Sequence, residues 1–70
     1  MPRYCVNRNA QPNGDHEVHD VSANKWCLPT SANRVDLGHH ETCSPAVQAA
    51  KIHFSQVNSC RWCAPACHTS

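Results

Sequence analysis

Cys60-Arg61-Trp62-Cys63 is the stretch that decides how this 70-residue chain is expected to fold. Two thiolates three positions apart in a tight turn can both bind one tetrahedral metal ion, at about 2.3 Å from each sulfur. Residues 64–68, which follow, contain one proline, one further cysteine and one histidine. They are too interrupted for a helix, and they indicate a cysteine-rich knuckle.

The composition explains why a metal-binding knuckle would matter. The chain contains six cysteines and six histidines, but only one Phe, one Tyr, one Met and two Trp. A core of this size rarely supplies more than about 3–5 kcal/mol, and chains this short usually add disulfides or a metal. We therefore expect residues 1–70 to form a single small zinc-binding domain, which unfolds when zinc (Zn2+) is removed.

Charge and hydropathy narrow the function classes. The formal net charge is +1 with neutral histidines, and the lysines and arginines are spread along the chain. This argues against the concentrated basic face that binds nucleic acid or an acidic membrane. The N-terminal residues contain no apolar stretch of signal-peptide length, and no segment has transmembrane length. We expect a cytoplasmic protein with reduced thiols, where such cysteine spacing indicates metal binding rather than disulfides.

The segment before the knuckle predicts one helix. Ser44-Pro45 is a good helix opening, because the hydroxyl can cap free N–H groups and a proline lacks one in the first turn. The helix is expected from about Pro45 to Gln56. Apolar residues recur along it at spacings of three, four and three, and so share one face: Val47, Ala50, Phe54 and Val57.

Three short extended segments precede this helix. Residues 3–7 and 33–38 alternate between apolar and polar side chains, and a further segment, residues 17–21, follows the turn-forming residues 11–15. The first two segments along the chain are expected to pair as a hairpin. Residues 22–32 are expected to be irregular. The predicted fold class is α+β: a small two- or three-stranded antiparallel sheet with one helix and a Cys-rich zinc knuckle.

The remaining metal ligands must come from upstream of the knuckle. Cys27, in the irregular loop, is the best third ligand, and His19, on the inner side of the second extended segment, is the best fourth. This Cys₃His set gives a closed structural site. Trp62 is expected to be buried and to shield the metal. Spacing alone leaves three alternates open: Cys67, Cys43 and His68.

The other cysteines have less specific interpretations. Cys43 lies at the start of the predicted helix, where a thiolate is favoured electrostatically, but it is equally well explained as a small buried apolar residue. It could also face Cys67 and form a disulfide under oxidising conditions. Cys5 is expected to be an inert strand residue.

His16-Glu17-Val18-His19 suggests a metalloprotease at first sight, but its spacing argues against one. A helical zinc-protease motif has histidines four positions apart, whereas these are three apart in a predicted strand, where they point to opposite faces. A thioredoxin-like role for Cys60 and Cys63 needs a βαβ scaffold that this chain is too short to build. We therefore expect the chain not to be an enzyme.

Further residues along nearly the whole chain form a pattern: the string HEVH at 16–19, Cys27-Leu28-Pro29, Asn33-Arg34, Leu37-Gly38, Cys43, Ala46-Val47, Ala50 and Cys60-x-x-Cys63-x-Pro65-x-Cys67-His68. This pattern resembles a family of short, uncharacterised bacterial proteins, and it implies no known activity. More distantly, the order His, Cys, Asn-Arg, an Ala-Ala helix and Cys-Arg-x-Cys-x-Pro is similar to the metal-binding domain of Ada-type DNA-repair proteins. That similarity again implies zinc bound by His19, Cys27, Cys60 and Cys63.

The leading functional hypothesis is a non-enzymatic structural-zinc module that mediates macromolecular contacts. The expected partner is a protein, the expected state is a monomer, and no membrane association is expected. Two alternatives stay open. One is a nucleic-acid-binding Ada-like zinc domain, in which Arg61-Trp62 would stack on bases. The other is a thiol redox or disulfide-stabilised small protein.

Overall fold

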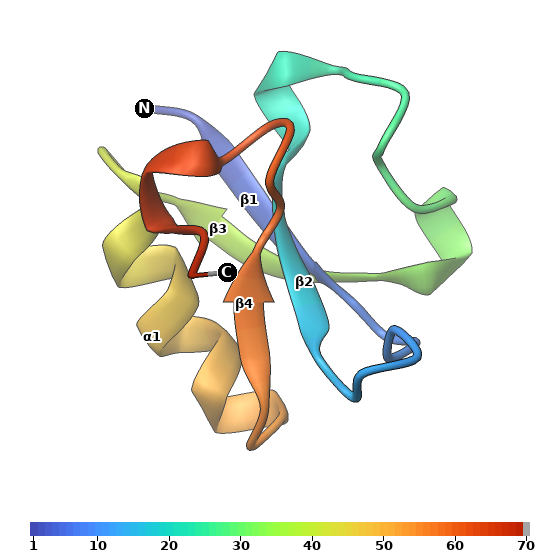
Figure 1. Cartoon of the computed structure of the whole chain (residues 1–70). Helices are drawn as coiled ribbons and strands as arrows, with labels where there is room; N and C mark the ends of the chain where they lie inside the picture. Colours follow the sequence, from blue (N-terminus) through green and yellow to red (C-terminus); the bar gives the residue numbers. More distant parts are fainter. Residues whose placement is uncertain (70) are drawn as a thin grey trace.

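The computed structural model describes residues 1–69, which form one α-helix, a four-stranded sheet and three short 3-10 turns (Figure 1). The α+β class predicted from the sequence is confirmed. No helix in the described part of the chain is long and apolar enough to cross a lipid bilayer. The elements in chain order are β1 (Arg3–Asn7), β2 (His16–Asp20), β3 (Arg34–His39), α1 (Cys43–His53) and β4 (Val57–Ser59), with 3-10 turns at Val21–Ala23, Ser31–Asn33 and Pro65–Cys67.

The sheet has the strand order β3-β1-β2-β4 and is mixed. β1 is antiparallel to both β2 and β3, which confirms the predicted hairpin and the third strand. β4 was not predicted, and it runs parallel to β2. Its three residues are too few to show strand alternation, and its first residue, Val57, also continues the helical spacing. Beyond β4, the Cys60 N–H donates to the Val18 carbonyl at 2.8 Å, so the knuckle begins directly beside β2.

α1 begins and ends earlier than the predicted range of residues 45–56. Thr42, with extended backbone angles, occupies the N-cap position, so Ser44 lies inside the first turn and the predicted Ser44 cap is wrong. Pro45 still falls in the first turn, where its missing N–H costs no helical hydrogen bond. The helix therefore starts where Cys43, rather than Pro45, enters the core.

Phe54 ends the helix because its side chain packs against the sheet. Its backbone is extended, with φ −139° and ψ 140°, and its N–H donates the last helical hydrogen bond to Ala50. The Phe54 ring stacks on His16 of β2, with centroids 3.7 Å apart and an interplanar angle of 8°. His16 thus lies on the helix side of the sheet, and His19 lies on the other side, as the strand period predicted. This geometry rules out a helical zinc-protease motif at residues 16–19.

The core lies between α1 and one face of the sheet. Tyr4 and Val6 of β1 and Val18 of β2 are buried against Ala46 and Ala50 of the helix. The small alanine side chains allow the helix backbone to lie close to the sheet. They also contribute little apolar area, so the core is as modest as the composition predicted.

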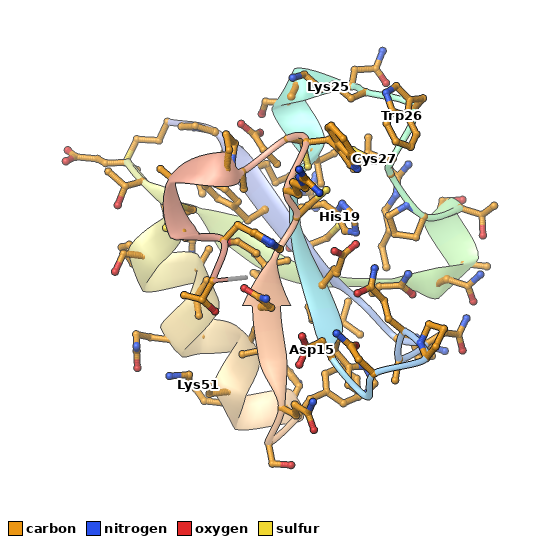
Figure 2. The ribbon with its side chains drawn as sticks, in the orientation of Figure 1. Asp15, His19, Lys25, Trp26, Cys27 and Lys51 are labelled. Carbon is orange, nitrogen blue, oxygen red and sulfur yellow. A yellow bond between two sulfur atoms is a disulfide. The ribbon has the colours of Figure 1, made fainter. Side chains whose placement is uncertain are left out.

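The opposite face of the sheet carries the candidate site. Cys5 and His19 are cross-strand partners, and they face away from the core because neighbouring side chains alternate. Residues 21–33 form the long connection on this side, while α1 lies on the other side of the sheet (Figure 1). Figure 2 shows Cys27 of this connection close to His19, far from Lys51 on the helix. The connection is mostly irregular, as predicted, apart from its two short 3-10 turns.

A disulfide joins the start of α1 to the last 3-10 turn. Cys43 and Cys67 are bonded, with Cα atoms 6.1 Å apart, and they are 24 positions apart in sequence. The sequence left this bridge open as one of several possibilities. In the structure it attaches the C-terminal tail to the helix.

Candidate metal centre

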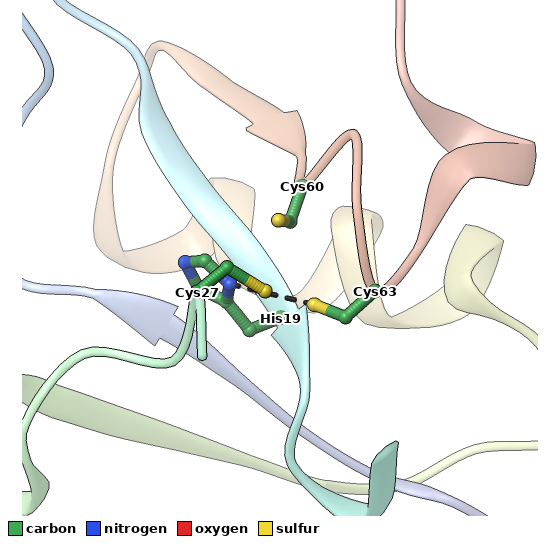
Figure 3. A group of neighbouring side chains, drawn as sticks. All are labelled: His19, Cys27, Cys60 and Cys63. Carbon is green, nitrogen blue, oxygen red and sulfur yellow. Dashed lines mark hydrogen bonds between the residues drawn. The ribbon is translucent and has the colours of Figure 1, made fainter. Parts of the chain in front are cut away.

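Four side chains from three separate segments converge on the face opposite the helix. The ligand atoms of His19, Cys27, Cys60 and Cys63 all lie within 4.8 Å of one another (Figure 3). His19 comes from β2, Cys27 from the connection of residues 21–33, and the other two from the knuckle after β4. The structure therefore brings together the four residues that the sequence predicted as ligands. That they bind a metal stays a prediction.

The separations fit a tetrahedral site. His19 Nδ1 lies 3.5 Å from Cys63 Sγ. In a regular tetrahedron with standard zinc–sulfur and zinc–nitrogen bonds, the N···S separation is about 3.5 Å and the S···S separation about 3.8 Å. All separations in the cluster lie within 4.8 Å, so none needs a contraction of more than about 1 Å to reach these values. His19, Cys60 and Cys63 are buried and Cys27 is half-buried, so the cluster is enclosed.

The backbones of the knuckle and of β2 direct N–H groups at the sulfurs. The Trp62 N–H donates to Cys60 Sγ at 3.4 Å, and the Asp20 N–H donates to Cys63 Sγ at 3.4 Å. A backbone bond from Ala64 N–H to the Cys60 carbonyl, at 3.0 Å, closes the turn between the two cysteines. Hydrogen bonds to an ionised acceptor are stronger than neutral ones, so these donors favour the thiolate form.

A local turn presents Cys27 to the cluster. Asn24 has a left-handed backbone with φ 48°, a conformation that asparagine tolerates better than most residues. The Leu28 N–H then donates to the Lys25 carbonyl at 3.2 Å, closing a turn around Trp26 and Cys27. The irregular backbone predicted here is thus an ordered reversal that points one thiol at the sheet.

Burial shifts the ionisation of the cluster. Burial raises the pKa of the Cys63 thiol. It also raises the pKa of the Cys27 thiol, and a hydrogen bond with the neighbouring Cys60 raises that pKa by a smaller amount. Burial also lowers the pKa of His19 to about 4, with a smaller contribution from the positive charge of Arg34. His19 is therefore neutral at pH 7, which is the metal-binding form of imidazole. Clustered thiols are costly to ionise together, and a divalent cation among them supplies the opposite charge that makes this favourable.

Glu17 lies beside the ring nitrogen of His19 that does not face the sulfurs. His19 Nδ1 faces the sulfurs, while its Nε2 is buried and has no hydrogen-bond partner within residues 1–69. The carboxylate of Glu17 lies 3.7 Å from that nitrogen, and burial raises the pKa of Glu17. Metal-binding histidines commonly donate their second N–H to a carboxylate. The sequence analysis missed this residue, although its signal, Glu-x-His in a strand, puts both side chains on one face.

None of the three alternate ligands joins the cluster. Cys43 and Cys67 are bonded to each other. His68 Nδ1 lies 2.8 Å from the Ser59 carbonyl, within hydrogen-bond distance, and it flanks β4. The structure thus separates these three side chains from His19 and the free thiols.

Trp62 does not shield the cluster, so that prediction is wrong. Half of its surface is exposed, and its ring packs on Trp26 at 5.7 Å between centroids, with an interplanar angle of 47°. In the short turn from Cys60 to Cys63, both sulfurs point inward. The residues between them consequently point outward. Turn geometry thus outweighs the preference of a large apolar side chain for burial.

Cys5 lies beside the cluster but outside it. It is buried, and burial raises its pKa to about 11, so its thiol stays protonated at neutral pH, in keeping with an inert residue. It lines a cavity of about 250 Å³ with five other residues, among them Arg3, Arg34 and Asp36. Arg3 is paired with Asp36 at 2.8 Å, and Arg34 donates to the Pro29 carbonyl at 2.8 Å. Arg3 thus joins β1 to β3, and Arg34 joins β3 to the connection of residues 21–33.

Comparison of the chain with protein-family models, curated proteins and solved structures gives no match. The resemblance to short bacterial proteins and the more distant similarity to Ada-type domains therefore stay predictions. The class of site rests on its own geometry: an enclosed group of three thiols and one imidazole, compatible with a metal ion.

Proposed function

We propose that this chain is a non-enzymatic zinc-binding module that contacts a partner protein in the cytoplasm. The observation that carries the proposal is the convergence of His19, Cys27, Cys60 and Cys63 within 4.8 Å from three segments of the chain. One ion there would connect β2, the connection of residues 21–33 and the knuckle. These segments are otherwise joined on this face by few buried apolar contacts.

The donor set selects zinc among common metals. Three sulfurs and one nitrogen in tetrahedral reach suit zinc, whereas calcium and magnesium prefer oxygen donors. Four protein ligands in an enclosed site leave no coordination position for a substrate, which is the arrangement of structural zinc sites rather than catalytic ones. Zinc would supply the cross-link here, and the chain's own residues would determine what it contacts.

The cluster fits a thiol redox protein less well. Reactive cysteines have lowered pKa values and partial exposure, whereas burial raises the pKa of Cys63 and of Cys27. The Cys43–Cys67 bridge favours the disulfide-stabilised alternative in one respect, because it fastens the tail to the helix. In a reducing cytoplasm that bridge would be open for most of the time. The zinc ion would then have to stabilise the domain alone.

Cobalt substitution tests the proposal. Cobalt(II) in a tetrahedral thiolate site gives visible d–d bands and near-ultraviolet sulfur-to-metal bands, and the intensity of the latter follows the number of thiolates. We expect one cobalt per chain, displaced by one zinc, and a sulfur band reduced by about a third in Cys27→Ser. An octahedral spectrum, or a band unchanged in Cys27→Ser, would count against the proposed ligand set. His53→Ala, on the exposed end of α1, is the matched control for adventitious histidine binding.

A further inference from the structure

The two tryptophans form an exposed aromatic cluster beside the metal centre. Trp26 is 78% exposed and Trp62 is 50% exposed, although tryptophan is among the most costly side chains to leave in water. They come from the two segments that supply the cysteines, since Trp26 precedes Cys27 and Trp62 precedes Cys63. Figure 2 shows Trp26 on the outer edge of its segment, directed away from the sheet. The contact between the two rings leaves most of the Trp26 surface open.

Two cations contact Trp62, one at its backbone carbonyl and one over its ring. Lys25 Nζ donates to the Trp62 carbonyl at 2.9 Å. The Arg61 guanidinium lies 5.1 Å from the centre of the Trp62 ring, in cation–π distance. Both positive charges are therefore fixed at the edge of the aromatic cluster. We call these four residues, Lys25, Trp26, Arg61 and Trp62, the Trp26–Trp62 patch.

The loops that carry this patch have no acidic side chain. In the sequence, no Asp or Glu occurs in residues 21–35 or in residues 42–70. The two charged side chains in contact with Trp62 are both positive, Lys25 at its carbonyl and Arg61 over its ring. Positive charge next to exposed aromatic surface favours an acidic binding partner.

We infer that the Trp26–Trp62 patch binds an acidic segment of a partner protein, one that also carries a large apolar side chain. This inference rests on the proposed zinc module, because the metal would fix the two loops that present the rings. Tryptophan and arginine are the residue types that dominate protein-interface energies, and exposed apolar patches rimmed by polar groups mark such interfaces. The acidic residues of the partner would face Lys25 and Arg61, and its apolar side chain would cover the rings.

A protein fits the patch better than a single-stranded nucleic acid. Nucleic-acid sites combine a track of cations along the backbone with open aromatic faces for successive bases. Here one ring face is taken by Arg61, and the rings are tilted by 47° toward each other. Two cations do not make a track, and the remaining lysines and arginines are dispersed over the chain.

Selection from a random peptide display library, using the zinc-loaded protein as bait, tests this inference. Zinc content is measured for every variant first, so loss of the metal is distinguished from loss of the docking surface. We expect the enriched peptides to combine Asp or Glu with an aromatic or aliphatic residue. Binding of a synthetic enriched peptide should quench or shift tryptophan fluorescence, because both tryptophans of the chain lie in the patch. It should also weaken with salt.

The variants decide which surface is used. Trp26→Ala and Lys25→Glu should each weaken the peptide by about tenfold or more, whereas Ile52→Ala, an equally exposed apolar residue on α1, should not. If Trp26→Ala loses zinc, the Trp26 ring is needed to keep the metal site folded. The test of the docking surface then depends on Lys25→Glu alone. The inference is overturned if no peptide is enriched, if the enriched peptides are not acidic, or if they bind the patch variants normally. Binding of an oligothymidylate in place of the peptides would also overturn it, in favour of nucleic acid.

Discussion

Chelation of zinc while the Cys43–Cys67 disulfide stays intact is expected to unfold the domain. The bridge spans 24 positions, and the chain-entropy relation for a loop of that length gives about 3.4 kcal/mol of stabilisation. A structural zinc site contributes about 10–16 kcal/mol at neutral pH. Small domains are stable by about 5–15 kcal/mol in total. The zinc contribution is thus comparable to the whole stability of such a domain, whereas the bridge supplies only a part of it, so the disulfide-bonded chain is expected to unfold without zinc.

Removing the disulfide while zinc stays bound should lower the stability much less. Replacing both bridge cysteines with alanine in the zinc-loaded protein is expected to lower the free energy of unfolding by about 3 kcal/mol and to leave the fold intact. The assay is urea unfolding together with amide dispersion in a ¹H–¹⁵N correlation spectrum. Four forms are compared, with and without zinc and with and without the bridge. A zinc-free, disulfide-bonded form that kept its dispersion and its urea midpoint would refute the reasoning.

Three further predictions follow from individual residues. The pKa of His19 is about 4 in the fold and 6.5 when unperturbed, so below pH 6.5 the unfolded chain binds a proton that the folded chain does not. This contribution of His19 is fully present above pH 6.5, and about 3 kcal/mol of it is lost as the pH drops toward 4. Zinc bound to His19 also competes with the proton, so the zinc-loaded protein should lose at least this much stability; a constant urea midpoint of that form from pH 7.5 to 4.5 would contradict this. Glu17→Gln should still bind one zinc ion, but with an affinity about 10- to 100-fold weaker. Competition with a chromophoric chelator measures this affinity. An unchanged affinity would show that the carboxylate does not act on His19. Gly14→Ala and Gly38→Ala should each lower the free energy of unfolding by about 1 kcal/mol, because both glycines have positive φ. Gly14→Ala should cost more, since its new Cβ would lie 3.2 Å from the Gln56 side chain whereas Gly38 has open space; equal urea midpoints for the two variants would contradict this.

Local sequence information was enough for the first half of the sheet. The alternation in residues 3–7 and the turn residues 11–15 determine the hairpin, and the structure has the first strand at the predicted bounds. Gly14 has the positive φ that the Asn-Gly turn requires. The side chain of Gln56 donates to the Asn13 carbonyl and to the Asp15 carboxylate, at 3.1 and 2.8 Å. This long-range contact reinforces the turn and has no sequence signal.

The missed features depend on contacts between distant residues. β4 exists because its three residues pair with β2, some 40 positions earlier in the chain, and parallel pairing leaves no local pattern to detect. The helix ends at His53 because Phe54 packs on His16, which residue spacing along α1 does not reveal. The fourth ligand was ambiguous for the same reason. Cys67 had suitable spacing, but the structure bonds it to Cys43.

The central claim is that His19, Cys27, Cys60 and Cys63 bind one zinc ion and that Cys43 and Cys67 do not. Native mass spectrometry with zinc quantification tests this most directly, on the wild-type chain, on Cys60→Ser, on His19→Ala and on the alanine double variant of the bridge. We predict one zinc per chain for the wild type and the bridge variant, and loss or marked weakening of zinc in the other two. A wild-type chain without zinc, or a bridge variant that loses it while His19→Ala retains it, would contradict the account.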